Sequence, residues 1–252
     1  MSEARRLERA YSSPEIAHQR YRTLLALNMQ PGEWFLDAGC GPGLLTEAVA
    51  RQVGSEGRVL AVDKSAEMLD LAAERCRKLP WVELRKGLIR HFDEADGLFD
   101  ALACSQVLLY VEDVAGVLAE MHRVLKPGGR LVIVETDWRS CVLNSSDFAL
   151  SEAMIKAWDD AVVSPNLPVK LMPLLRSLGF NAVSVEPIPV LNTSLLEDGY
   201  SSDIIGWFAR KAVEQGAASE SQAHDWLQDL QEKSRRGEYF FCVNRFLFSA
   251  VK

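Results

Sequence analysis

The chain has 252 residues, 48% of them hydrophobic and 25% charged, which suits one large domain with an ordinary core. Its net charge of −7 and sequence pI near 5.2 disfavour nucleic acids and anionic membranes as partners. The opening MSEARRLERA has no apolar segment of signal-peptide length, and the five cysteines form no CxxC pair. We therefore expect a cytoplasmic protein with reduced thiols.

Strand and helix patterns alternate along the first half of the chain. Residues 1–30 are expected to form a helical cap, with Ser13 as an N-cap. The expected strands are 34–37, 58–63, 82–87, 99–105 and 130–136, and the expected helices are 44–53, 65–79 and 111–125. This alternation of apolar strands with helices predicts an α/β protein whose parallel sheet is covered on both faces.

The pattern changes after residue 137. The expected elements there are a helix-rich segment at about 145–179, a strand at 182–190, helices near 198–216 and 219–235, and a final strand at 239–251. We expect a domain at 31–252 with helical lid insertions at about 138–180 and 198–236. With the N-terminal cap, these would lie over the carboxyl ends of the strands, where open α/β sheets bind ligands.

The stretch LDAGCGPG, residues 36–43, places three glycines at alternate positions between the first sheet strand and the helix that follows. A glycine-rich turn there directs backbone N–H groups and the positive end of a helix toward a ligand. Dinucleotide-binding loops have the spacing GxGxxG, but this loop has Leu44 where the third glycine would stand. Asp37 would repel a pyrophosphate and suits an ammonium group. The charge therefore favours S-adenosylmethionine, a sulfonium with an α-amino group.

Asp63 ends the second strand of the sheet pattern. A carboxylate at this place can accept two charge-strengthened hydrogen bonds from ribose hydroxyls. By itself the residue could equally cap the helix that begins at Ser65. Together with the glycine loop, it supports a nucleoside-binding site.

Four segments resemble the class I S-adenosylmethionine-dependent methyltransferases: LDAGCGPG, VLAVDKSAEML, FDALACSQVLLYVEDV and MHRVLKPGGRLVIVETDW. Within that group they look like the branch of ubiquinone/menaquinone-biosynthesis and other small-molecule methyltransferases. The resemblance covers about residues 30–140 motif by motif, and the remainder only by strand order. It implies a Rossmann-like sheet of seven strands, mostly parallel, whose last strand at 239–251 is antiparallel.

The resemblance also implies which residues bind S-adenosylmethionine. The glycine loop and Asp37 would surround the methionine part, Asp63 the ribose, and the backbone that ends the fourth strand the amino-acid part. Tyr21 is included because it could close over the cofactor, although packing within the helix layer explains its position equally well. The full expected set is Asp37, Gly39, Cys40, Gly41, Gly43, Asp63, Lys64, Met68, Gly87, Leu88, Ile89, Cys104, Ser105 and Tyr21.

One position departs from the family's pattern. Such enzymes often carry Gly-Asp after the third strand, and the carboxylate accepts a hydrogen bond from the adenine amino group. This chain has Gly87-Leu88 instead, although the backbone of Leu88 and Ile89 would still bond adenine. Loss of one net hydrogen bond weakens cofactor binding by at most about 1–1.5 kcal/mol.

The residues CSQV at 104–107 narrow the choice of acceptor. They lack the Asn/Asp-Pro-Pro-aromatic turn of enzymes that methylate exocyclic amines of nucleobases or amide nitrogens. No cysteine follows a proline, which counts against cytosine C5 methylation. We therefore expect a small-molecule methyl acceptor from secondary or quinone metabolism. We also expect no nucleic-acid or membrane partner, and a protein that is a monomer or a homodimer.

A general base is needed only if the acceptor is a poor nucleophile such as a hydroxyl. The candidates for acid–base or orienting roles are Gln106, Tyr110, Asp137 and His91. Gln106 and Tyr110 could equally line the pocket, and His91 could be a solvated loop residue. Asp137 has no companion Asp/Asn pair, so no metal is expected.

Aromatic residues are frequent in the predicted lid. A lid lined by them would favour a flat, apolar or cationic acceptor, although core packing explains the same pattern. The expected acceptor-pocket residues are Tyr11, Gln106, Tyr110, Trp138, Trp158, Tyr200 and Trp207. Two alternatives stay open: a protein that uses the cofactor without methyl transfer, and a methyltransferase acting on RNA or protein.

Overall fold

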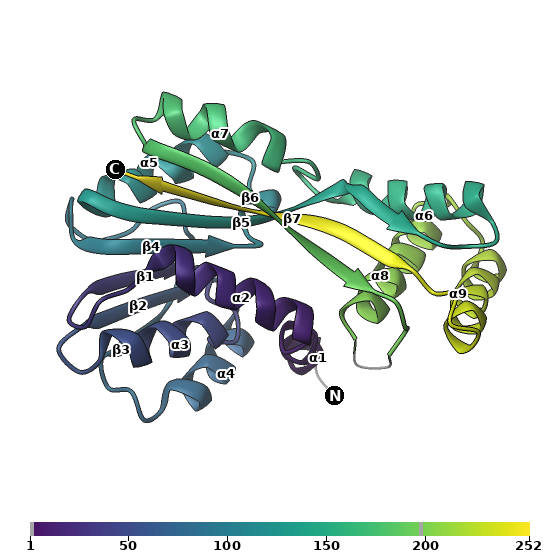
Figure 1. Ribbon diagram of the computed structural model, residues 1–252, viewed down its shortest axis with the longest axis horizontal. Helices are drawn as coiled ribbons and strands as arrows, with labels where there is room; N and C mark the ends of the chain where they lie inside the picture. Colours follow the sequence, from purple (N-terminus) through teal and green to yellow (C-terminus); the bar gives the residue numbers. More distant parts are fainter. Residues whose placement is uncertain (1–2, 197–198) are drawn as a thin grey trace. The chain divides into compact units, whose positions relative to one another are not determined.

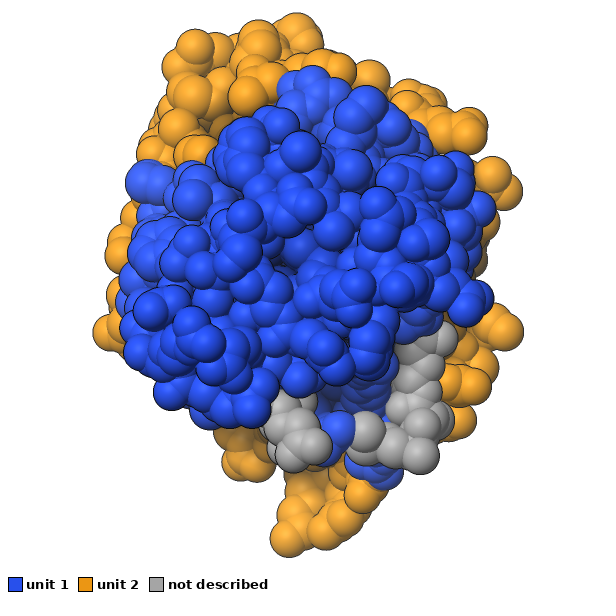
Figure 2. Space-filling model, turned by 90° about the vertical axis from the view of Figure 1, so that its right-hand side faces the viewer, with its two compact units in different colours: residues 1–18, 136–166, 187–245 blue, residues 19–135, 167–186, 246–252 orange. Residues whose placement is uncertain are grey.

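A computed structural model of the chain describes residues 3–196 and 199–252. Seven strands form one sheet in the order β3-β2-β1-β4-β5-β7-β6 (Figure 1). The chain divides into two compact units (Figure 2). The loop unit contains the glycine loop and consists of residues 19–135, 167–186 and 246–252, and the aromatic unit consists of residues 1–18, 136–166 and 187–245.

The loop unit has the predicted alternation of strands and helices. Its strands are β1 (Trp34–Ala38), β2 (Arg58–Asp63), β3 (Val82–Lys86), β4 (Phe99–Ser105) and the first part of β5 (Leu125–Leu143). Its helices are most of α2 (Pro14–Leu27), then α3 (Leu44–Val53), α4 (Ala66–Cys76), η1 (Leu108–Tyr110), α5 (Val114–Val124) and α7 (Pro168–Ser177). Strand β1 pairs in parallel with β2 and β4, β2 with β3, and β4 with β5.

Helices cover both faces of this part of the sheet, as the apolar strands predict. Leu36 on β1 packs into one buried cluster with Leu118 on α5 and Leu171 on α7. Successive strand residues point to opposite faces, so the buried Phe35 belongs to the other face. Helix α3 contacts β1 and β2, and α4 contacts β2 and β3. The strands β1, β2 and β4, whose carboxyl ends lead into the loops of the candidate site, are therefore packed between two layers of helices.

Side-chain caps fix where two of the helices begin. The Ser65 hydroxyl accepts a hydrogen bond from the Met68 N–H at 3.3 Å, so α4 starts at the predicted cap. Helix α5 starts later than predicted, because the Asp113 carboxylate accepts from the Gly116 N–H at 2.8 Å and caps it there.

Strand β5 is longer than the predicted 130–136. The turn Pro127-Gly128-Gly129 lies inside it as a register shift against β4. Beyond residue 136 the strand continues into the aromatic unit, where the Asn144 N–H donates to the Phe240 carbonyl just before β7 (Phe241–Val251). At the opposite end, the Gly128 N–H donates to the Lys252 carbonyl. The two strands therefore run in opposite directions, which confirms the antiparallel last strand.

The aromatic unit is mainly helical. Its helices are α1 (Glu3–Tyr11), α6 (Phe148–Ala161), α8 (Tyr200–Glu214) and α9 (Glu220–Arg235), and it includes parts of β5, β6 (Asn181–Asn192) and β7. Helix α8 contacts α1, α6 and α9. Residue 198, where the sequence pattern places the start of α8, lies outside the described residues. Helix α7, which falls within the expected 138–180 insertion, belongs to the loop unit.

Between residues 3–196 and 199–252, no helix has both the length and the apolar character needed to cross a membrane. The same ranges hold no group of three His, Cys, Asp or Glu side chains arranged to bind a metal ion.

Candidate active site

The three glycines of the loop between β1 and α3 serve different purposes. A Cβ added at Gly39 would lie 2.3 Å from Cγ2 of Val107, and one added at Gly43 would lie 2.9 Å from Cβ of Ala72 on α4. These two glycines let the loop pack closely against its neighbours. Gly41 has a φ of 51°, and a Cβ there would meet nothing within 4 Å. The loop backbone at Gly41 therefore faces open space in which a ligand can approach it.

Asp37 is a buried carboxyl at the end of β1, only 3% exposed. Its Oδ2 accepts a hydrogen bond from the Thr46 hydroxyl at 2.6 Å. Burial raises the pKa of Asp37 to about 7, the charge of Asp63 adds to the rise, and the bond from Thr46 opposes it. A cationic group bound beside Asp37 would favour its ionised form. This carboxyl therefore fits a ligand that carries an ammonium group.

Asp63 braces the glycine loop and the start of α4. Its Oδ2 accepts from the Gly41 N–H at 2.8 Å, and its Oδ1 accepts from the Ser65 N–H at 2.8 Å. The side chain that caps α4 is that of Ser65, so Asp63 supports the start of this helix without being its cap. Each carboxylate oxygen can accept more than one hydrogen bond, so the arrangement is also compatible with ribose hydroxyls as further donors.

The turn after β3 lies beside the end of β2, because the Gly87 N–H donates to the Asp63 carbonyl at 3.0 Å. Leu88 is 50% exposed, whereas Ile89 is buried. Lys64 is exposed next to Asp63, and Met68 is half-buried in the first turn of α4. These are the residues that the resemblance assigns to adenosine, and the backbone bond from Gly87 brings their two loops side by side.

The end of β4 is connected to helix α2. The Ser105 hydroxyl accepts a hydrogen bond from Nε2 of Gln19 at 3.1 Å. Gln19 was not singled out from the sequence, because a buried polar residue on a helix has no signature of its own. Tyr21, on the same helix, is 56% exposed. Burial raises the pKa of the Cys104 thiol and that of Cys40 in the glycine loop, so both thiols stay protonated.

Gln106 and Glu135 hold the ends of β4 and β5 together. Gln106 has a φ of 59°, and both its backbone N–H and its Nε2 donate to the Val134 carbonyl, at 2.8 and 3.2 Å. Glu135 is fully buried, and its Oε1 accepts from the N–H groups of Val107 and Leu108 at 3.0 and 2.7 Å. Sequence reasoning missed Glu135, although an acid directly after the apolar run LVIV was a usable signal. A positive φ is uncommon for a non-glycine residue, and such strained positions cluster at functional sites, which keeps Gln106 among the candidates.

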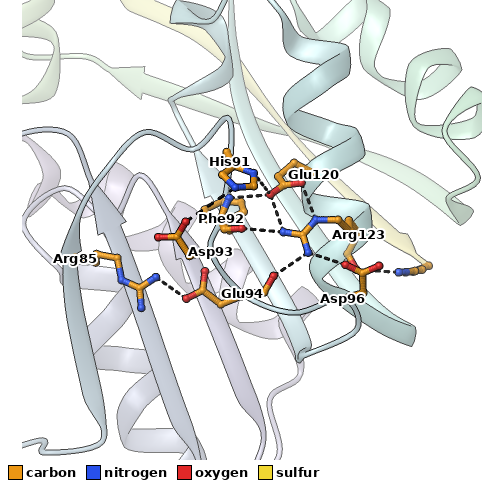
Figure 3. A network of polar contacts seen from close by, with 9 residues as sticks. Arg85, His91, Phe92, Asp93, Glu94, Asp96, Glu120 and Arg123 are labelled. Atoms are coloured by element: carbon orange, nitrogen blue, oxygen red, sulfur yellow. Dashed lines mark hydrogen bonds and ion pairs between the residues drawn. The ribbon is translucent and has the colours of Figure 1, made fainter.

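The remaining acid–base candidates have different surroundings. The His91 side chain is 71% exposed, with Nδ1 3.1 Å from the Glu120 carboxylate and Nε2 4.0 Å from that of Asp93 (Figure 3). Tyr110, which ends η1, is 50% exposed. Asp137 lies in the aromatic unit, and burial raises its pKa although it accepts a hydrogen bond from a backbone N–H two residues later.

All three tryptophans of the expected pocket come together in the aromatic unit. The Trp138 ring meets the Trp158 ring edge-on, with centroids 5.5 Å apart, and Trp158 stacks on Trp207 at 5.7 Å. Trp138 and Trp158 are 3% and 8% exposed. In the described part of the chain, neither of their indole N–H groups has a hydrogen-bond partner. Core packing is therefore part of their role, and each carries a buried polar donor.

Tyr200 and Tyr11 are the other expected pocket residues of the aromatic unit. The Tyr200 hydroxyl accepts a hydrogen bond from Nη2 of Arg245 at 2.8 Å, and that guanidinium lies 4.8 Å from the centre of the tyrosine ring. Tyr11 is half-buried at the end of α1. The expected cofactor residues all belong to the loop unit, whereas the expected pocket is divided, since Gln106 and Tyr110 belong to the loop unit.

Comparison with known proteins gives matches of three kinds. Residues 36–133 match the family described as a methyltransferase domain. A demethylmenaquinone methyltransferase of Alkalihalophilus pseudofirmus is 30% identical over 195 residues, which are 68% of this chain and 82% of the relative. An uncharacterized 37.1 kDa protein in a transposon of Streptomyces fradiae is 34% identical over 240 residues, 93% of this chain and 67% of that protein. The crystal structure of the YcgJ protein from Bacillus subtilis, 19% identical, has the same fold, with a TM-score of 0.63 over 94% of this chain and 98% of that one.

Proposed function

This chain belongs to the class I S-adenosylmethionine-dependent methyltransferases, and we propose that it transfers a methyl group directly to a small-molecule acceptor. It is a methyltransferase, and its cofactor is S-adenosylmethionine. One observation carries the proposed cofactor site. The Asp63 carboxylate accepts from the N–H of Gly41, which faces open space, and Asp63 lies close enough to Asp37 to raise its pKa, so the two carboxyls together fit a ligand with an ammonium group and a ribose.

Each part of the cofactor has a proposed partner. Asp37 and the glycine loop would bind the methionine part, with Asp37 ionised beside the ammonium group. Asp63 would accept hydrogen bonds from the ribose hydroxyls. The backbone of Leu88 and Ile89 would bond adenine, and the backbone at the end of β4 would contact the amino-acid part.

The bound cofactor supplies a methyl group that is already activated on a sulfonium, so positioning of the acceptor provides much of the catalysis. Gln106 is the proposed orienting residue, because its backbone and side chain are both fixed to Val134. Glu135 holds the backbone that follows Gln106. If the acceptor is a hydroxyl, Asp137 is the candidate base, since its raised pKa makes proton uptake more favourable.

The aromatic unit is the proposed acceptor-binding part. The half-buried Trp207 would present a flat apolar surface that Trp158 supports by stacking, and the indole N–H groups of Trp138 and Trp158 are buried donors behind it. Water would be excluded by the helical cap at 1–30 and by the lid insertions at about 138–180 and 198–236. The name of the 30% identical relative gives demethylmenaquinone as its substrate, a small molecule, which supports an acceptor from quinone or secondary metabolism. We propose that the protein acts in the cytoplasm as a monomer or homodimer, without a nucleic-acid or membrane partner.

The test is release of S-adenosylhomocysteine from S-adenosylmethionine in the presence of separate acceptor panels. The panels contain phenols and quinols, amines, carboxylates, bulk RNA and unfolded protein. The proposal predicts release that depends on one small-molecule panel and matches the amount of methylated acceptor. Methylation confined to RNA or protein would contradict it. Cofactor binding without release in any panel would favour the alternative of cofactor use without methyl transfer.

A further inference from the structure

A network of polar contacts ties the loop between β3 and β4 to helix α5 (Figure 3). At its centre is Arg123 of α5. One terminal nitrogen of its guanidinium donates to the Glu94 carbonyl at 2.8 Å and to the Asp96 carboxylate at 2.7 Å. The other donates to the Phe92 carbonyl at 2.9 Å and to Glu120 at 2.8 Å, and Nε also donates to Glu120 at 2.8 Å. One side chain therefore holds three residues of the loop.

Glu120 and the backbone of α5 complete the attachment. The Glu120 carboxylate accepts from the Phe92 N–H at 2.7 Å, and the Arg123 carbonyl accepts from the Gly97 N–H at 3.0 Å. The hydrogen bond from Arg123 lowers the pKa of Glu120 to about 2, so this carboxylate is ionised throughout the neutral range. The contacts on Phe92, Glu94 and Gly97 involve the main chain of the loop. They therefore fix the path of its backbone and not only its side chains.

The same loop begins with the residues proposed to contact adenine. Ile89 and Phe92 are both buried in the core cluster that includes α5, which connects the start of the loop to the part held by Arg123. Leu88 is half exposed and has no carboxylate to offer. A side-chain acceptor can adjust to adenine by rotating, whereas a main-chain acceptor or donor lies only where the loop places it. Recognition through the backbone therefore makes the position of this loop more important than usual.

We infer that Arg123 is a positioning residue for adenine recognition, which it serves by fixing the main chain of the loop that starts at Leu88. The inference rests on the proposed cofactor site. It goes beyond that site because Arg123 touches none of the proposed cofactor residues through the contacts above. Its effect would be transmitted from Phe92 back to Ile89 by the buried anchors.

The experiment measures dissociation constants for two ligands by calorimetry: S-adenosylhomocysteine, and S-inosylhomocysteine, which carries an oxygen in place of the adenine amino group. The wild type is compared with Arg123→Gln and Arg123→Lys. The matched control is Arg236→Gln, because Arg236, the residue that follows α9, donates to Glu232 of that helix at 2.8 Å. All measurements are made well below the melting temperature of each variant.

The wild type should prefer the adenine ligand. Arg123→Gln should weaken S-adenosylhomocysteine binding by about tenfold, the scale of one net hydrogen bond, and should narrow its preference over the inosine ligand. Arg123→Lys keeps the charge but loses the forked geometry, so its affinity should lie between those of the wild type and Arg123→Gln. The control should behave as the wild type.

Two results would overturn the inference. Unchanged affinities in Arg123→Gln would show that adenine recognition does not depend on the contacts between Arg123 and the loop. An equal loss for both ligands would show a general structural role without adenine recognition. If Arg123→Gln does not fold, Glu120→Gln takes its place. This change weakens the hydrogen bonds that Arg123 donates to Glu120 but keeps an oxygen that accepts from the Phe92 N–H. Failure of the wild type to bind S-adenosylhomocysteine would instead contradict the proposed cofactor site itself.

Discussion

The carboxyls of the proposed cofactor site and the tryptophans of the aromatic unit differ in how their buried polar groups are hydrogen-bonded. In the loop unit, Asp37 and Asp63 are held by hydrogen bonds from Thr46, Gly41 and Ser65, all within the same unit. In the aromatic unit, the buried indole N–H groups of Trp138 and Trp158 have no partner among the described residues. In the proposed function, the first group of residues binds the cofactor, which methyltransferases share, and the second belongs to the part that binds the acceptor, which differs between them. The contrast explains why the two parts differ in how readily the sequence predicts them.

The largest expected effect is on the stability of the aromatic unit. Trp158→Ala removes a buried ring that contacts Trp138 and Trp207, and should lower the free energy of unfolding by about 3–5 kcal/mol. Chemical denaturation measures the loss. The exposed Val163 of the same unit is the control, since Val163→Ala should stay within about 0.5 kcal/mol of the wild type. A large loss of S-adenosylhomocysteine affinity in folded Trp158→Ala would contradict the proposal that the loop unit binds the cofactor and the aromatic unit binds the acceptor.

The next effect concerns the charge of Asp37. Asp37→Asn should weaken S-adenosylhomocysteine binding by about 10–100-fold at pH 8, because it removes a hydrogen bond to a charged group. In the wild type the affinity should rise between pH 6 and 8, as Asp37 loses its proton near pH 7. The variant should show no such rise. The exposed Asp70 on α4 gives the control, Asp70→Asn.

Ionisation of Asp37 should strengthen cofactor binding but lower the stability of the folded chain. The pKa of Asp37 in the folded chain, about 7, lies above its usual 3.8, so the folded state keeps a proton that the unfolded chain has lost. The free energy of unfolding should therefore fall as the pH rises from about 4 to 7, and this fall should be smaller in Asp37→Asn. For the binding prediction, a wild-type affinity for S-adenosylhomocysteine that does not change between pH 6 and 8 would contradict the proposed ion pair of Asp37 with the ammonium group.

The smallest expected effect is a gain. Leu88→Asp introduces, at a half-exposed position, the carboxylate that the resemblance leads one to expect there. Affinity for S-adenosylhomocysteine should increase by up to about tenfold, equivalent to about 1–1.4 kcal/mol. Leu88→Ser is the matched control, since its short side chain adds no charge. A weaker affinity in Leu88→Asp would mean that adenine lies elsewhere.

Local patterns account for what the sequence predicted. Glycine spacing, the Ser65 cap and apolar strand runs each depend on neighbouring residues, and parallel strands bring their carboxyl ends to one edge. The contact of Gln19 with Ser105 joins residues far apart in the chain, so no local pattern announces it. The extension of β5 past residue 136 likewise depends on pairing with β7, a strand that begins about a hundred residues later.

The most direct test of the cofactor site is the thermal shift of the purified protein with S-adenosylmethionine, S-adenosylhomocysteine and NAD, with Asp63→Ala measured alongside. A ligand at 100 times its dissociation constant stabilises by about 2.7 kcal/mol, enough to raise the melting temperature by several degrees. The proposed site predicts this shift with both sulfur ligands, none with NAD, and its loss in Asp63→Ala. No shift of the wild type with either sulfur ligand, or a shift that Asp63→Ala retains in full, would contradict it.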